Sequence, residues 1–342
     1  MNFEALRKKY DRHNMIALLR GFPAQFEDAI EIGNSYKIPG KYKKKDFQNV
    51  LVQGMGGSGI GGILLKNLFG GKRGMKKNML PIEVNQNYGL PDFVDEHTLM
   101  FAVSYSGNTE ETLSGFELAK ERKSTMIALT SGGELAHKSK NTILLPPGLP
   151  PRTQLAYTFI PMAVVLQKLG TINATKDLDD TRIMLKKNIK NFEEQGRRLA
   201  LKLHKKIPVI YSSKRFEGSL IRFHTQIAEN AKSFSHWNVI PELTHNEIVG
   251  FRPFEKQLFF VFFREKNEDK RIRKRFEVTK KIAGKKSGVY EVYCTGKTRF
   301  EKMFSFIMIG DFASYYLALL NKVDPWPVPN IDFLKKELAK IK

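Results

Sequence analysis

A glycine-rich segment, GMGGSGIGG at residues 54–62, follows one apolar run and precedes another with helical spacing. Glycines let a backbone turn sharply and approach a ligand, and the first N–H groups of the following helix attract an anion. The segment therefore predicts phosphate binding at Gly56, Gly57 and Ser58. Two alternatives stay open. The glycines also fit the G-x-G-x-x-G spacing of dinucleotide folds, with Glu83 as the acidic residue, or they form a tight structural turn.

A second polar segment, SYSGNTEET at residues 104–112, places hydroxyls at Ser104, Ser106 and Thr109 directly after another apolar run. Asn108 or Thr109 is suited to cap the helix that follows. Ordinary capping needs one hydroxyl, whereas three hydroxyls and a helix N-terminus form a neutral cradle for phosphate. Two such loops on adjacent strands favour a phosphosugar over the other ligands.

Both loops require strands that end where the loops begin. Short apolar runs predict strands and periodic apolar spacing predicts helices, with the strands at 49–53, 81–84, 98–104, 125–129 and 142–145 and the helices at 59–68 and 110–120. Continuous apolar strands that alternate with helices are typical of a parallel sheet covered on both faces.

The second half of the chain repeats this alternation. Strands are predicted at 208–212, 258–263 and 289–293, with helices at 218–231 and 304–320, and residues 234–240 form a strand or a loop. We expect an α/β fold with an N-terminal domain at 1–175, a connecting helix at 176–206 and a C-terminal domain at 207–342.

The composition, with 42% hydrophobic residues, is that of a globular protein. The only cysteine, Cys294, excludes an internal disulfide and suits a reducing compartment. The charged segment 1–14 lacks the apolar stretch of a signal peptide, and the apolar stretch 304–320 is interrupted by Asp311 and too short for a bilayer. We therefore expect a cytoplasmic protein that spans no membrane.

The net charge of +22 fits either a nucleic-acid partner or anionic small molecules. The sequence has no basic region leading into heptads, no Cys/His finger spacing and no aromatic RNA-binding signature. Nucleic acid is thus the weaker alternative.

The segments GMGGSG and SYSGNTEET resemble the sugar isomerase (SIS) domain, and the longer pattern resembles the bifunctional phosphoglucose/phosphomannose isomerases. That resemblance continues in order through PPRTQLAY at 150–157, ENAK at 229–232, PELTHNEIVG at 241–250 and DPWPVPNIDFLK at 324–335. It implies two SIS domains, each a flavodoxin-like three-layer sandwich, in a tight homodimer with shared active sites. It also implies a phosphorylated hexose as substrate, with no metal and no other cofactor.

The activity that the resemblance implies is the interconversion of glucose 6-phosphate and mannose 6-phosphate with fructose 6-phosphate through an enediol. This chemistry needs a base, a cation for the developing oxyanion, a ring-opening group and a phosphate anchor. By resemblance, Glu229 in ENAK is the base and Arg152 in PPRTQ is the cation. By residue type alone, a glutamate and an arginine in such positions are more often plain surface residues, so the resemblance carries both assignments.

The remaining roles also come from the resemblance. His245 is the ring-opening acid/base and reaches the partner subunit's site, and Lys335 closes over the site and assists ring opening. Glu242 and His245 have metal-site spacing, but no second cluster accompanies them. Trp326 lies in a segment that lines the sugar end of the pocket and bears on glucose versus mannose specificity. Isomerisation of another sugar phosphate and a non-catalytic phosphosugar-binding regulator stay as alternatives.

Overall fold

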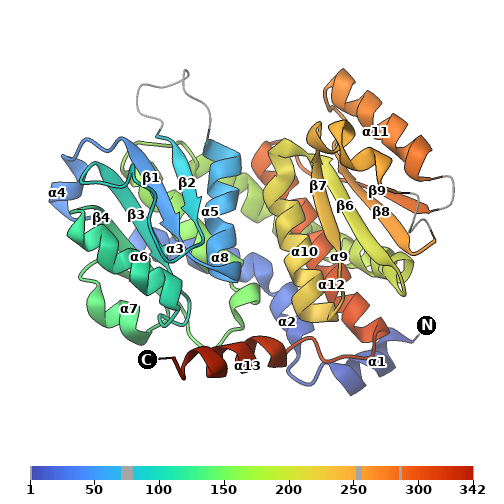
Figure 1. Ribbon diagram of the computed structural model, residues 1–342, viewed down its shortest axis with the longest axis horizontal. Helices are drawn as coiled ribbons and strands as arrows, with labels where there is room; N and C mark the ends of the chain where they lie inside the picture. The colour runs from blue at the N-terminus through green and yellow to red at the C-terminus, as the bar shows by residue number, and fades with distance from the viewer. Residues whose placement is uncertain (1, 71–79, 252–255, 285–286, 342) are drawn as a thin grey trace.

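The computed structural model describes residues 2–70, 80–251, 256–284 and 287–341. Two sheets lie side by side with helices between and around them (Figure 1). The first half contains α1 (Phe3–Tyr10), α2 (Met15–Arg20), α3 (Phe22–Ser35), α4 (Gly40–Lys43), β1 (Asn49–Gln53), α5 (Gly56–Phe69), β2 (Ile82–Asn85), β3 (Thr98–Val103), α6 (Glu110–Glu121), β4 (Thr125–Thr130), α7 (Gly133–Lys138), β5 (Thr142–Leu144), the 3-10 helix η1 (Pro151–Thr153), α8 (Leu155–Lys168) and α9 (Thr175–Leu203).

The second half has the same alternation with fewer strands. It contains β6 (Ile207–Ser213), η2 (Lys214–Phe216), α10 (Glu217–Ala231), β7 (His236–Ile240), η3 (Glu242–His245), η4 (Glu247–Val249), β8 (Leu258–Arg264), α11 (Lys270–Ala283), β9 (Gly288–Tyr293), α12 (Arg299–Leu320) and α13 (Pro329–Leu338).

All strand pairs in both sheets are parallel, in the orders β2-β1-β3-β4-β5 and β7-β6-β8-β9. The strand order reverses between β1 and β3 in the first sheet, as in flavodoxin-like folds. Ligands of such folds bind at the carboxyl ends of the strands where this reversal occurs. The predicted α/β architecture is confirmed, and the two candidate phosphate loops lie at this reversal.

The strands read as continuous apolar runs because both faces of the first sheet are covered. On β1, Val50 and Val52 belong to the large core under α5 and α8, while Leu51 belongs to a smaller core with Phe116 of α6 and Leu135 of α7. Neighbouring residues of one strand thus enter different cores.

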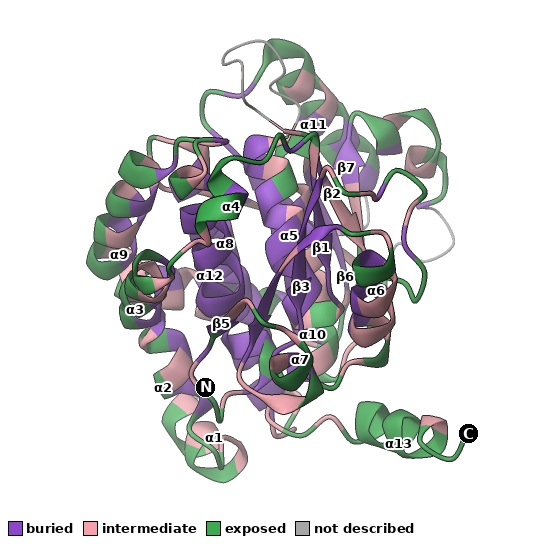
Figure 2. Ribbon diagram, turned by 90° about the vertical axis from the view of Figure 1, so that its left-hand side faces the viewer, coloured by how far each residue is buried: buried purple, intermediate pink, exposed green. Residues whose placement is uncertain are grey.

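The large core is continuous from one sheet to the other. Phe101 on β3 and Val261 on β8 both belong to it, and most of α12 fills the space between. In the described residues, α12 is the one helix with the length and hydropathy of a membrane span, and all of that span is buried inside the protein. Figure 2 shows α12 and the central strand β3 as buried. The apolar sequence of α12 therefore reflects a core helix.

Several boundaries differ from the sequence-based prediction for local reasons. Helix α12 begins at Arg299, because Thr298 and Glu301 form a capping box. The segment left open as strand or loop is β7, which pairs with β6. Helix α9 packs along α12 and α3, so the predicted connecting helix is also a packing element. The domain boundaries themselves stay a prediction.

Candidate active site

The two predicted phosphate loops are in direct contact. The Ser58 hydroxyl oxygen accepts a hydrogen bond from the Tyr105 backbone N–H at 3.2 Å. On its other side, the start of α5 touches the turn that carries Arg152. A Cβ on Gly57 would lie only 2.7 Å from the Pro151 carbonyl oxygen, so only glycine permits this approach. The glycine-rich loop therefore lies between the second loop and the arginine turn.

The hydroxyls of the second loop differ in accessibility. Ser104 is fully buried, and its hydroxyl donates to Thr109 Oγ1 at 2.9 Å. Thr109 is the N-cap residue of α6, but its side chain makes no capping bond. Asn108 accepts from the Glu134 backbone N–H instead, so the predicted side-chain cap is wrong. Because Thr109 Oγ1 accepts the hydrogen bond from Ser104, the hydroxyl hydrogen of Thr109 is free for a ligand. Ser106 is exposed, so its hydroxyl is accessible as well.

Arg152 lies at the meeting point of three distant segments. Its guanidinium is buried and donates from Nε to Asn230 Oδ1 at 2.7 Å. Nη2 donates to the carbonyls of Pro325 at 2.5 Å and Trp326 at 2.6 Å. Nη1 lies 3.5 Å from the Glu229 carboxylate. The structure thus brings together the two residues assigned as cation and base.

The two charged side chains of this ion pair differ in their exposure to solvent. The Glu229 side chain is 25% exposed, whereas the Arg152 side chain is 4% exposed. Burial lowers the pKa of Arg152, with Glu229 and Asp324 acting in the opposite direction. The carboxylate therefore opens toward solvent beside a fixed, enclosed cation, which is a suitable arrangement for a base.

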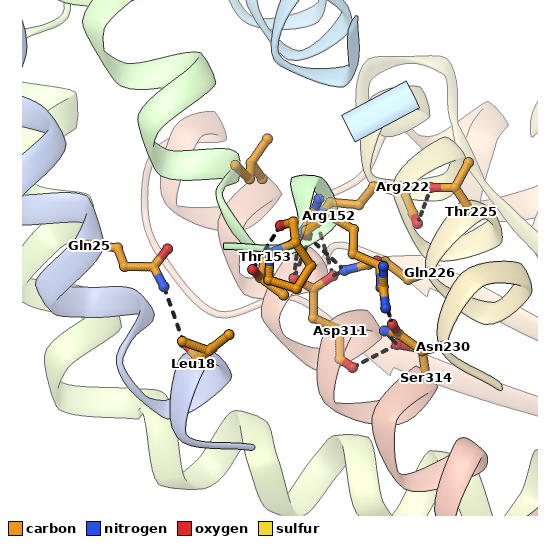
Figure 3. A network of polar contacts seen from close by, with 12 residues as sticks. Leu18, Gln25, Arg152, Thr153, Arg222, Thr225, Gln226, Asn230, Asp311 and Ser314 are labelled. Atoms are coloured by element: carbon orange, nitrogen blue, oxygen red, sulfur yellow. Dashed lines mark hydrogen bonds and ion pairs between the residues drawn. The ribbon is translucent and has the colours of Figure 1, made fainter. Parts of the chain in front are cut away.

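A buried polar network holds the backbone of Arg152 from behind (Figure 3). Arg222 Nη2 donates to the Arg152 carbonyl at 2.9 Å and pairs with Asp311 at 2.7 Å. Gln226 also donates to Asp311, at 3.1 Å. Burial raises the pKa of Asp311, while Arg222 and Gln226 act to lower it. Because α10 and α12 supply these groups, the second half of the chain positions the arginine of the first half.

His245 and Lys335 lie elsewhere. Across the described ranges, no hydrogen bond or ion pair joins either residue to Arg152 or Glu229. His245 is exposed at the end of η3. Lys335 is exposed on α13, which has no buried residue and lies at the edge of the molecule (Figure 2). One copy of the chain thus leaves both predicted ring-opening residues on its surface.

The segment that carries His245 is anchored through Glu247. This carboxylate pairs with His236 Nε2 at 2.9 Å and accepts from Asn238 Nδ2 at 2.5 Å. Tyr211 donates its hydroxyl hydrogen to the same group. Burial acts to raise the pKa of Glu247, but these partners hold it below its usual value, and the hydrogen bond to Glu247 raises the pKa of His236.

Sequence analysis missed two groups at the site, His13 and Lys232. His13 stacks on the ring of Trp326 at 4.8 Å and lies 3.7 Å from Asp324, and no sequence signal marked it. Trp326 contributes its carbonyl to Arg152 and its ring to His13. Lys232 also lies here, and its place in ENAK was a signal that could have been used.

The sequence also raised a dinucleotide and a metal ion as ligands. Glu83, the acidic residue of the dinucleotide interpretation, pairs with Lys66 on α5 at 2.7 Å, so this carboxylate is already engaged. Within the part of the chain that the structure describes, no group of three or more His, Cys, Asp or Glu side chains is placed to hold a metal ion. The metal-free site stays a prediction.

Comparison with known proteins identifies the fold family. The family described as "SIS domain" matches residues 49–167, and "Bacterial phospho-glucose isomerase C-terminal SIS domain" matches residues 192–338. A protein of Caldicellulosiruptor bescii named bifunctional phosphoglucose/phosphomannose isomerase is 40% identical over an alignment of 345 positions. The alignment covers 96% of this chain and 100% of that protein. The chain belongs to the bifunctional phosphoglucose/phosphomannose isomerase family. It contains two SIS domains, as the sequence motifs predicted.

More distant members of the SIS fold differ in name. A D-glucosamine-6-phosphate 4-epimerase of Sulfolobus acidocaldarius is 34% identical over 229 residues, or 65% of this chain and 68% of that protein. Among solved structures, the C-terminal domain of glucosamine-fructose-6-phosphate aminotransferase from Francisella tularensis superposes with a TM-score of 0.72 at 14% identity, covering 92% of this chain and 97% of that one. At that identity the likeness shows the fold alone.

Proposed function

We propose that this protein is an aldose–ketose isomerase that interconverts glucose 6-phosphate and mannose 6-phosphate with fructose 6-phosphate. The observation that carries the proposal is the Glu229 carboxylate 3.5 Å from the enclosed guanidinium of Arg152, next to two phosphate-type loops. Its support from the family is the 40% identity over nearly the whole chain.

The substrate phosphate is held where the two loops meet. Ser106 and Thr109 donate their hydroxyl hydrogens to it, and the backbone N–H groups of Gly56 and Gly57 add the positive end of α5. Ser58 and Ser104 act indirectly, because the hydrogen bonds of their hydroxyls hold the phosphate-binding loops in position.

Glu229 moves the proton of the reaction. Its carboxylate takes the hydrogen from the carbon beside the carbonyl, and the C–H electron pair forms the double bond of the enediolate. Negative charge then develops on the former carbonyl oxygen, near the Arg152 guanidinium. A proton then passes from the neighbouring hydroxyl to this oxygen. Glu229 returns its proton to the former carbonyl carbon, and the neighbouring oxygen becomes the new carbonyl. An enediol is planar at the reacting carbons, so return of the proton to either face gives the glucose or the mannose epimer.

We assign the opening of the sugar ring to two residues that the partner subunit supplies. In this proposal the protein is a homodimer, and the partner subunit's His245 and Lys335 complete the site. The exposure of His245 and Lys335 and the absence of a described contact to Glu229 within one copy support this arrangement.

The decisive assay is direct turnover of fructose 6-phosphate, with glucose 6-phosphate and mannose 6-phosphate measured as separate products. Glu229→Gln keeps the volume and removes the base, so it should lower kcat by about 10²–10⁴-fold. A folded wild-type protein that produces neither aldose would refute the isomerase function.

The shared site is tested by mixing inactive variants. A heterodimer of Glu229→Gln and His245→Ala subunits has one site with both defects and one with neither, so random refolding should restore up to about a quarter of wild-type activity. The matched control mixes Glu229→Gln with Arg152→Met, whose defects fall in different sites of the heterodimer and restore nothing. Proven heterodimers without regained activity would show that each subunit holds its own histidine.

A second candidate is epimerisation of an amino-sugar phosphate, which the Sulfolobus relative favours. Incubation with glucosamine 6-phosphate, with products separated by chromatography, distinguishes it from isomerisation. Binding of either sugar phosphate without any turnover would instead indicate a regulator.

A further inference from the structure

Lys232 lies beside the Glu229–Arg152 pair at the end of α10. Its backbone is left-handed, with φ at 52°. This geometry folds the side chain back over the last helical turn, where the ammonium donates to the Glu229 carbonyl oxygen at 2.5 Å. The Pro325 carbonyl lies at 3.5 Å, so Lys232 and Arg152 approach the same carbonyl.

Three of the five N–H donors of Arg152 are committed to the protein. A guanidinium has five N–H groups. Nε is used by Asn230, and both hydrogens of Nη2 are used by the carbonyls of Pro325 and Trp326. The two N–H groups of Nη1 remain, and Nη1 lies 3.5 Å from the Glu229 carboxylate. Arg152 thus uses most of its donors to hold the protein, and only its Nη1 edge can meet a sugar oxygen.

Lys232 offers a further donor close to Arg152. An ammonium carries three N–H groups, of which one goes to the Glu229 carbonyl and one reaches toward Pro325 at the limit of hydrogen bonding. No carboxylate in the described residues forms an ion pair with it, and the residue is solvent-accessible. At least one N–H is therefore available to a ligand at the end of α10, where Lys232 and Arg152 approach the same Pro325 carbonyl.

We propose that Lys232 is a further catalytic residue, whose ammonium donates a hydrogen bond to the sugar oxygen that becomes negative as Glu229 removes the carbon-bound hydrogen. The inference rests on the proposed isomerase function. The C–H electron pair forms the C=C bond, and the carbonyl π pair moves onto the oxygen. A proton then passes from the hydroxyl on the adjacent carbon to that oxygen, and Glu229 returns its own proton to the former carbonyl carbon. Lys232 keeps its protons throughout.

A purely structural role has different consequences. A lysine at a helix end also stabilises the last carbonyl groups. Lys123 and Lys205 occupy similar left-handed positions just after α6 and α9, at φ of 59° and 61°, and both are exposed. Lys123→Met is therefore a matched control for Lys232→Met, because it makes the same side-chain change on the same kind of backbone.

The charge environment of Lys232 gives a pH signature. Arg152 on η1, Asp324 after α12 and Glu229 on its own helix face the ammonium, and His13 lies behind Asp324. Burial and then the charge of Arg152 lower the pKa of Lys232 to about 8, although Asp324 and Glu229 act to raise it. Since kcat/KM reports the free enzyme, it should fall above about pH 8, to roughly a tenth at pH 9. Arginine at this position stays charged there.

The experiment compares wild type, Lys232→Met, Lys232→Arg and Lys123→Met with fructose 6-phosphate as substrate between about pH 6 and 10. Lys232→Met should lower kcat about 100-fold, the usual effect of losing one oxyanion donor, with KM changed much less. Lys232→Arg should keep activity at alkaline pH, and Lys123→Met should match wild type in kcat and in its pH profile.

Two results would overturn the role of Lys232 while the isomerase function stands. One is a Lys232→Met enzyme within twofold of the wild-type kcat. The other is the same alkaline decline in wild type and Lys232→Arg, which stays decisive if the methionine variant does not fold. A wild-type protein without turnover of fructose 6-phosphate would instead refute the isomerase function and this role together.

Discussion

Removing the carboxylate of Asp311 should both destabilise the protein and displace Arg152. Asp311 and Arg222 are enclosed, with side chains 2% and 4% exposed. Nη2 of Arg222 lies 2.7 Å from Asp311 Oδ2, and Nε lies 3.0 Å from Oδ1. Asp311→Ala would leave the guanidinium charged and unpaired inside the core. Breaking a buried pair in this way costs about 3–5 kcal/mol of unfolding free energy.

A double variant separates stability from positioning. Replacing both members, as in Arg222→Met with Asp311→Leu, leaves no unpaired charge, and such replacements are often neutral for stability. The same double variant removes the Arg222 hydrogen bond to the Arg152 carbonyl. Stability should therefore largely return while kcat stays low, because the turn that carries Arg152 has lost its main support.

Urea denaturation at neutral pH gives the free energies, and fructose 6-phosphate turnover gives kcat. Asp180→Ala is the control, because Asp180 pairs with Lys176 on the surface of α9, and its loss should leave both quantities unchanged. The electrostatic reasoning is refuted if Asp311→Ala costs less than about 1 kcal/mol, or if the double variant is no more stable than Asp311→Ala.

Three further predictions concern the loops and the anchored segment. Gly57→Ala should lower kcat at least tenfold, because its Cβ would push away the turn of Arg152 and small misplacements near a site are costly. Gly40→Ala, with nothing within 4 Å, should change nothing. Ser106→Ala with Thr109→Val should raise KM by an amount equal to roughly 1–3 kcal/mol per hydroxyl, and an unchanged KM would remove both from the phosphate site. His236, whose pKa is raised by its carboxylate partner, stabilises the fold below about pH 6.5 and loses this effect as the pH rises through the raised pKa. His236→Gln should remove that part of the pH dependence in urea denaturation, and identical pH dependence in both proteins would contradict it.

Elements with strong local signals were predictable from sequence. The strands β1 and β3 read as apolar runs because they are buried on both faces, and the loops after them stand out by glycine and hydroxyl content. The identity of Arg152 and Glu229 as neighbours came from family motifs and not from local pattern. Seventy-seven residues of sequence, 229 − 152, separate them, and local periodicity has no information on such a contact.

The supporting groups were hidden for the same reason. The carbonyls that hold Arg152 belong to Pro325 and Trp326, and backbone acceptors carry no residue-type signal. Asp311 interrupts an apolar helix, and from the sequence this interruption served only as evidence against a membrane span. In the structure, Asp311 balances the charge of the buried Arg222. His13 reaches the site by stacking on Trp326 and by its approach to Asp324, and a single histidine in a charged segment predicts neither contact.

The core that runs unbroken from one sheet to the other limits how the protein can move. Domains joined by short linkers close around ligands by hinge rotation, but a large apolar interface opposes that motion. With Phe101, Val261 and α12 in one packed interior, the two sheets should behave as a single rigid body. Substrate entry then depends on surface segments such as the exposed α13, and the site around Arg152 and Glu229 should have nearly the same shape before and after the sugar arrives.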